Sequence, residues 1–127
     1  MFLEAKNALV FKKGNETLMI EPWGTNSFRV RSTMDPNFID RDWALTEKIN
    51  HGNAKISVTE QGASIINGKI EAKVNNNGII TFYKDGVRIL HEYHRSYDPS
   101  ATKESCCTKV INRQWQGIIG GDYKLSV

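Results

Sequence analysis

The sequence predicts an all-β fold, an antiparallel β-sandwich, because turn signals recur between short segments in which apolar and polar residues alternate. Three of these turn signals are Asn67-Gly68, Asn76-Asn77-Gly78 and Asp85-Gly86. Asn, Asp and Gly tolerate the positive φ values that tight hairpin turns need. The stretch from Asn67 to Tyr93 is therefore predicted to be a β-meander, with about ten short strands in the whole chain.

Alternation within the meander predicts which side of each strand faces the core. Apolar residues at every second position define one face, and the intervening residues, such as Lys69, Glu71 and Lys73, define the other. The residues predicted to share the core-facing side are Ile70, Ala72, Val74, Ile80, Phe82, Val87, Ile89 and His91.

Four further strands are predicted before the meander. Gly14-Asn15 closes the first, and Pro22-Trp23-Gly24 ends the second, because Pro lacks an amide donor and Gly allows an unusual backbone angle. Phe28 and Val30 share one face of the third strand. The four predicted strands span residues 8–13, 17–20, 26–33 and 55–60.

The segments outside these strands have other patterns. Residues 40–49 are predicted to form a short helix with Asp40 as its N-cap, and residues 95–105 a long polar loop. Strand character returns at residues 106–111, 114–119 and 122–127. Because the last strand pattern runs to the end of the sequence, we expect a truncated sandwich whose closing strands are absent.

The composition is that of an ordinary globular domain. Its 127 residues are 39% hydrophobic and 24% charged, which suits a single domain, 1–127, with its own core. The net charge is +3 and the basic residues are scattered, so nucleic-acid binding is not expected. No apolar run approaches the ~20 residues that span a bilayer, and residues 1–6 lack a secretory-signal pattern. No membrane partner is therefore expected.

The two cysteines of the chain are adjacent. Cys106 and Cys107 would point to opposite faces of a strand, so a disulfide between them would be strained. Two thiols alone also fall short of the four ligands of a structural zinc site. We interpret them as reduced thiols, and we expect a cytoplasmic protein without a metal ion.

Three carboxylates, Asp35, Asp40 and Asp42, lie close together in the irregular segment after residue 33. Two carboxylates beside an aromatic platform such as Trp43 are what glycoside hydrolysis requires. Asp beside Pro or Asn is also ordinary turn and cap chemistry. We favour the cap-and-turn interpretation, which gives these carboxylates no catalytic role.

Histidines and tryptophans supply the other candidate site residues. His91 and His94 lack the spacing of the helical His-Glu-x-x-His zinc motif, and on a strand these positions fall on opposite faces. Trp23, Trp43 and Trp115 are candidates for a sugar-binding surface, although burial in a core or interface is the favoured interpretation. We therefore assign no metal ligand and no catalytic residue.

Two stretches, and the strand patterns between them, are similar to one known family. Residues 20–33 resemble the early strand pair of glycoside hydrolase family 31, the α-glucosidases and α-xylosidases, and contain the run Trp-Gly-Thr-Asn-Ser-Phe-Arg-Val-Arg at 23–31 that is typical of it. Residues 120–127 resemble the segment that leads out of the N-terminal domain of that family. The Gly-x-Ile-x-Ala-x-Val, Gly-x-Ile-x-Phe and Asp-Gly-x-x-Ile-Leu patterns between them fit the same domain, so the resemblance covers nearly the whole chain.

The resemblance implies a fold and a function. In this family the N-terminal domain is a galactose mutarotase-like β-sandwich, and it packs on a (β/α)8 barrel that carries the two catalytic aspartates of a retaining α-glycosidase. A chain of 127 residues cannot hold a barrel of ~250 residues, so no catalytic residue is carried over and substrate-binding residues stay unassigned. The resemblance therefore implies a non-catalytic N-terminal domain of an α-glucosidase or α-xylosidase that needs no cofactor.

Two alternatives stay open. A free-standing carbohydrate-binding β-sandwich would expose a row of aromatic side chains, including Trp23, Trp43 or Trp115. A subunit-interaction module would form a homodimer, in which a second copy covers the edge of an unfinished sheet.

Overall fold

The structure, a computed structural model, describes residues 1–34, 38, 53–96, 112–117 and 124–126. Within these residues, eleven strands form two antiparallel sheets and no helix is present. The predicted all-β sandwich is therefore confirmed. The helix predicted at 40–49 and the strand predicted at 106–111 lie outside the described residues.

The first sheet has four strands in sequential order, and each is antiparallel to the next. Lys6 and Asn7, with φ values of 44° and 68°, form the tight turn between its first two strands. The ammonium group of Met1 donates a 2.9 Å hydrogen bond to the carbonyl of Lys12, which holds the N-terminus on the second strand. The strands are β1 (Phe2–Ala5), β2 (Ala8–Lys13), β3 (Glu16–Pro22) and β4 (Phe28–Thr33).

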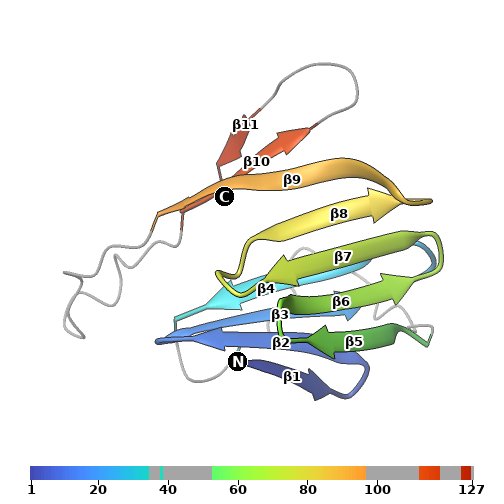
Figure 1. Ribbon diagram of the computed structural model, residues 1–127, viewed down its shortest axis with the longest axis horizontal. Helices are drawn as coiled ribbons and strands as arrows, with labels where there is room; N and C mark the ends of the chain where they lie inside the picture. Colours follow the sequence, from blue (N-terminus) through green and yellow to red (C-terminus); the bar gives the residue numbers. More distant parts are fainter. Residues whose placement is uncertain (35–37, 39–52, 97–111, 118–123, 127) are drawn as a thin grey trace.

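The second sheet has seven strands in the order β11-β10-β9-β8-β7-β6-β5, all antiparallel to their neighbours. Strands β7 to β9 confirm the meander predicted from Asn67 to Tyr93. In Figure 1, β9, β10 and β11 lie beyond the edge of the four-stranded sheet. The strands are β5 (Lys55–Thr59), β6 (Gly62–Asn67), β7 (Ile70–Asn75), β8 (Ile80–Lys84), β9 (Val87–Ser96), β10 (Asn112–Gly117) and β11 (Lys124–Ser126).

One apolar core fills the space between the two sheets. Strands β2, β3, β6, β7 and β8 contribute its buried residues, at alternate positions where a strand supplies more than one, as period-2 spacing requires. Burying one Leu, Ile or Phe side chain stabilises the fold by about 1.5–3 kcal/mol, so this cluster is the main source of stability among the described residues. Its buried members are Leu9, Phe11, Leu18 and Ile20 from the four-stranded sheet, and Ala63, Ile65, Ala72, Val74 and Ile80 from the seven-stranded sheet.

A polar clasp joins the two sheets through their connecting turns. Asn67, which is buried, donates from Nδ2 to the carbonyl oxygens of Gly24 and Ser27 at 2.9 and 2.8 Å. Asn26 accepts a 2.7 Å hydrogen bond at Oδ1 from the amide of Lys69. Since residues 24–27 connect β3 to β4, these bonds fix a turn of one sheet against the β6–β7 turn of the other.

Most predicted strands are confirmed with small changes at their ends. The predicted strands 17–20 and 26–33 correspond to β3 and β4, and the last two correspond to β10 and β11. β1 and β6 were not predicted as strands. Gly62 was interpreted as a turn, but it begins β6, where its φ of 153° and the close approach of the Val74 carbonyl leave no room for a Cβ atom.

The predicted facing of β9 is wrong from Ile89 onward. In the register between β8 and β9, Phe82 pairs with Leu90 and Tyr83 pairs with Arg88, which leaves Ile89 as an extra residue in a bulge. Val87 lies before the bulge and pairs with Lys84, on the same side of β8 as Phe82, but is 63% exposed. The bulge reverses the alternation after it, so Leu90 packs against the core. His91, one residue after Leu90, therefore lies on the outer face of the sheet rather than on the core side.

Candidate functional site

A row of polar residues crosses the outer face of the seven-stranded sheet. Strand register places Ser57 beside Ser64, Ser64 beside Lys73, Lys73 beside Thr81 and Thr81 beside His91. The row thus runs across β5, β6, β7, β8 and β9, one residue from each strand. Directly opposed residues on one face have Cβ atoms about 5 Å apart, so neighbouring side chains in the row can contact a common ligand.

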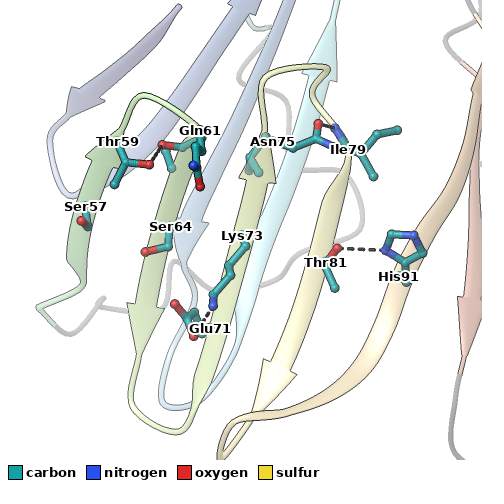
Figure 2. Close-up of a pocket in the computed structure, with 13 residues that line it drawn as sticks. Ser57, Thr59, Gln61, Ser64, Glu71, Lys73, Asn75, Ile79, Thr81 and His91 are labelled. Carbon is teal, nitrogen blue, oxygen red and sulfur yellow. Dashed lines mark hydrogen bonds and ion pairs between the residues drawn. The ribbon is translucent and has the colours of Figure 1, made fainter.

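This outer-face row forms part of the lining of a hollow of about 420 Å³. Its volume is within the range of ~300–1,000 Å³ that is usual for small-molecule sites. Figure 2 shows the side chains of Ser57, Ser64, Lys73 and Thr81 on successive strands, with Gln61 and Asn75 near one end. We call this feature the outer hollow, and its full lining is Ser57, Thr59, Gln61, Gly62, Ala63, Ser64, Glu71, Lys73, Val74, Asn75, Ile79, Thr81 and His91.

Lys73 is the one lysine in the outer hollow, and its side chain leans along β7. Its Nζ lies 3.9 Å from Glu71 Oε2 and 4.8 Å from the centroid of the Tyr83 ring. Figure 2 shows the side chain extending toward Glu71. The Lys73 side chain extends toward Glu71 and away from its own row. The floor of the outer hollow beside Lys73 is therefore formed by the short side chains of Ser64 and Thr81. The ion pair contributes little to stability, since the Lys73 side chain is 53% exposed.

His91 forms one end of the polar row. Its Nδ1 lies 2.9 Å from Thr81 Oγ1, and these atoms form a hydrogen bond. Partial burial lowers the pKa of His91 below its ordinary value of 6.5, and the nearby positive charge of Arg88 lowers it further. Above pH 6.5 the imidazole is therefore neutral, and it presents one donor and one acceptor nitrogen.

Asn75 and Thr59 order the end of the outer hollow that lies at the β5–β6 and β7–β8 turns (Figure 2). Asn75 Oδ1 accepts hydrogen bonds from the amides of Asn77 and Ile79 at 2.9 and 3.0 Å, which closes the β7–β8 turn. Thr59 Oγ1 donates to the carbonyl of Gly62 at 3.1 Å. These hydrogen bonds between side chains and the backbone fix the ends of the strands, so the backbone that lines this end of the hollow is well ordered.

A second group of charged and aromatic residues lies on or beside β3 and β4. Glu21 Oε1 is 3.6 Å from Arg29 and 3.3 Å from Arg31. The Arg29 guanidinium lies 5.0 Å from the centroid of the Trp23 ring, and that of Arg31 lies 4.9 Å from the ring of Phe38. Trp23 is therefore half-buried under an arginine and offers no free stacking platform on that side.

The other candidate residues of the sequence are placed only in part. Trp23 is the one candidate tryptophan whose side chain is described, and the described residues include Trp115 only as a backbone position of β10, paired with Glu92 of β9. Outside the described residues lie Asp35, Asp40, Asp42, Trp43, Cys106 and Cys107.

In the register between β9 and β10, His91 pairs with Gln116 and His94 pairs with Gln114. Among the described residues, no group of three or more His, Cys, Asp or Glu side chains is placed to hold a metal ion. The described part of the chain also contains no helix that is long and apolar enough to span a membrane.

The outer-face row itself was missed in the sequence. Ser57, Ser64 and Thr81 are common surface residues, and single strands give no reason to group them. The signal that could have found them is the short hairpin turn, because turn type and loop length fix the register of the flanking strands.

Comparison with known proteins gives one consistent result. No protein-family model matches the sequence. An uncharacterized family 31 glucosidase, ORF2, from Pseudescherichia vulneris is 31% identical over 134 residues, a match that covers 98% of this chain and 25% of that protein. The homologues of this chain are family 31 glycosidases. The chain spans about a quarter of the length of the curated relative it matches.

A solved structure extends the family 31 similarity to the fold. The crystal structure of a family 31 α-xylosidase from a soil metagenome, in complex with xylose, matches with a TM-score of 0.75 and 28% sequence identity. The match covers 94% of this chain and 21% of that one. Over nearly its whole length the chain is thus similar, in sequence and in fold, to one part of larger family 31 glycosidases, as the resemblance in its sequence predicted.

Proposed function

We propose that this chain is the non-catalytic N-terminal β-sandwich of a retaining family 31 α-glycosidase that hydrolyses an α-linked glucoside or xyloside. The observation that carries the proposal is the pattern of coverage. Nearly all of the chain aligns with a quarter of a family 31 glucosidase and with a fifth of an α-xylosidase. A unit that occupies a quarter of an enzyme leaves the remaining length for a catalytic domain.

The environments of three buried or partly buried carboxylates support a non-catalytic role. Glu92 is fully buried and accepts a 2.9 Å hydrogen bond at Oε2 from the amide of Ile80. Glu16 is buried and accepts a 3.1 Å hydrogen bond from Ser32. Glu21 lies between two arginines. These three carboxylates hold strands together, whereas a glycosidase acid/base pair must face the same open substrate site.

The partner of the domain in this proposal is a (β/α)8 barrel of ~250 residues within the same enzyme. The sandwich would stabilise the barrel and form one wall of its substrate site. The chemistry of glycoside hydrolysis needs two carboxylates and no cofactor, so we propose none. We also propose a cytoplasmic location, which is supported by the presence of only two cysteines, in adjacent positions.

An activity assay of the chain alone tests its non-catalytic role. We expect no release of nitrophenol from nitrophenyl α-glucoside or nitrophenyl α-xyloside above the rate in buffer. A family 31 enzyme that contains both its β domain and its barrel serves as the positive control. Release of nitrophenol in proportion to the concentration of this chain would overturn the proposal.

A homodimer is a second proposal about partners. β5 is the last strand of its sheet among the described residues, and Val58 on this strand is 53% exposed. An open strand edge with an exposed apolar side chain favours pairing with another chain. Light scattering is expected to give a molar mass that rises from that of one chain toward that of two as concentration increases. A mass of one chain throughout would contradict the dimer.

A further inference from the structure

The floor of the outer hollow is made of short hydroxyl-bearing side chains. Ser57, Ser64 and Thr81 stand on β5, β6 and β8, in one register row across the sheet. Neighbouring strands are about 4.8 Å apart, so Ser57 and Ser64 lie one strand spacing apart, and Ser64 and Thr81 lie two spacings apart with Lys73 between them. Each hydroxyl donates one hydrogen bond and accepts up to two, and it rotates to suit its partner. Such a row fits a ligand that itself presents many hydroxyl groups.

The charges of the outer hollow are internally balanced. The ammonium group of Lys73 lies next to the Glu71 carboxylate and over the Tyr83 ring. An anionic ligand such as a phosphate would have to compete with Glu71 for this lysine, and repulsion from the same carboxylate would weaken its binding. At the end of the row, His91 is engaged with Thr81. The hollow therefore favours a ligand without net charge.

Apolar side chains beside the hydroxyl row complete a surface of mixed character. Ile79 lines the outer hollow next to Asn75, and Ile66, which is 36% exposed, lies on the outer face one row away. The C–H faces of a sugar ring need apolar contacts of this kind while its hydroxyl groups are hydrogen-bonded. A few placed polar groups beside apolar ones are the usual composition of a small-molecule site.

We propose that the outer hollow is a binding site for a neutral oligosaccharide, held by hydrogen bonds from Ser57, Ser64, Thr81 and His91. The geometry of the row carries this proposal. The choice of an α-linked glucose oligomer as the probe rests on the proposed function. In this arrangement the β domain binds a carbohydrate through its sheet face, in addition to supporting the rest of the enzyme.

The test is a titration of the isotopically labelled 127-residue chain with maltotriose, followed by NMR of the backbone amides. We expect saturable shifts in amides of β5 to β9 around the outer hollow. Ser64→Ala and Thr81→Val should each weaken binding by about fivefold to tenfold, since each removes one hydrogen-bonding group. Thr17→Val is the matched control, because Thr17 lies on β3 of the other sheet, on the side away from buried Leu18. This control should bind as the unmodified chain does.

Three results would overturn the proposal. They are the absence of saturable shifts, shifts centred on Trp23 instead of the outer hollow, and unchanged affinity in both hydroxyl variants. Inorganic phosphate is titrated in a parallel arm, and saturable binding of phosphate without binding of maltotriose would show an anion site instead. The nitrophenyl assay measures hydrolysis, whereas the titration measures binding. Hydrolysis by the chain would therefore contradict the proposed non-catalytic role and leave the proposed binding site untouched.

Discussion

The two faces of the seven-stranded sheet differ in how they use the same backbone. On the inner face, Ile65, Ala72 and Ile80 are 0% exposed and pack against the four-stranded sheet. On the outer face, Ser64 and Thr81, the chain neighbours of Ile65 and Ile80, line an open hollow. Adjacent residues of one strand therefore have different roles, because one packs in the core and the next lines the hollow. A substitution on the inner face should affect stability, and one on the outer face should affect ligand binding.

The largest effect is expected on the inner face of β6. Ile65→Ala removes a fully buried side chain and leaves a cavity, so we expect a loss of about 2–5 kcal/mol in the free energy of unfolding. Ser64→Ala, one residue away on the outer face, should change it by less than about 0.5 kcal/mol. Urea denaturation followed by fluorescence measures both. Equal losses in the two variants would remove the distinction between the faces.

An intermediate effect is expected for Glu92, a buried polar residue of the inner face. Glu92→Ala deprives the Ile80 amide of its buried acceptor, so we expect a loss of about 1–3 kcal/mol. Glu92→Gln keeps an acceptor oxygen at that place and should lose less. Urea denaturation of both variants provides the comparison. If Gln were as destabilising as Ala, the hydrogen bond to Ile80 would not be the reason for the buried glutamate.

The smallest effect is a pH dependence on the outer face. The pKa of His91 is lowered in the folded chain, so the unfolded chain binds the proton first as pH falls. The contribution of His91 to stability is therefore present above pH 6.5 and is lost as pH falls from 6.5 through the lowered pKa of the folded state. His91→Gln should lack this component. Denaturation of both chains between pH 7.5 and about 5 measures the difference, and parallel curves would contradict it.

The sequence predicts the regular parts of this fold because local chemistry decides them. The Asp85-Gly86 turn has positive φ values at both residues, as its composition predicts, and Ala72 and Val74 face the core as their alternation predicts. Lys6-Asn7 carries no comparable signal, so β1 was missed.

Features that depend on the pairing between strands cannot be predicted from the sequence of a single strand. The bulge at Ile89 arises from the register between β8 and β9, and no residue type in the chain marks it. The outer-face row is hidden for the same reason, since Ser57, Ser64 and Thr81 come together only when the register of four strands is known. The family resemblance predicted the fold and led to the proposed parent enzyme, but it carried no site residue onto this chain.

The central claim is that the inner face of β8 stabilises the domain and that its outer face binds carbohydrate. Thermal unfolding of the unmodified chain, Ile80→Val and Thr81→Val, each with and without maltotriose, tests this claim most directly. Ile80→Val should lower the midpoint by a few degrees, since it removes about 1 kcal/mol, and should keep the full rise on adding maltotriose. Thr81→Val removes the hydrogen bond to His91 and should lower the midpoint by no more than Ile80→Val does, but its rise on adding maltotriose should be much smaller. A full maltotriose-dependent rise in Thr81→Val would contradict the account.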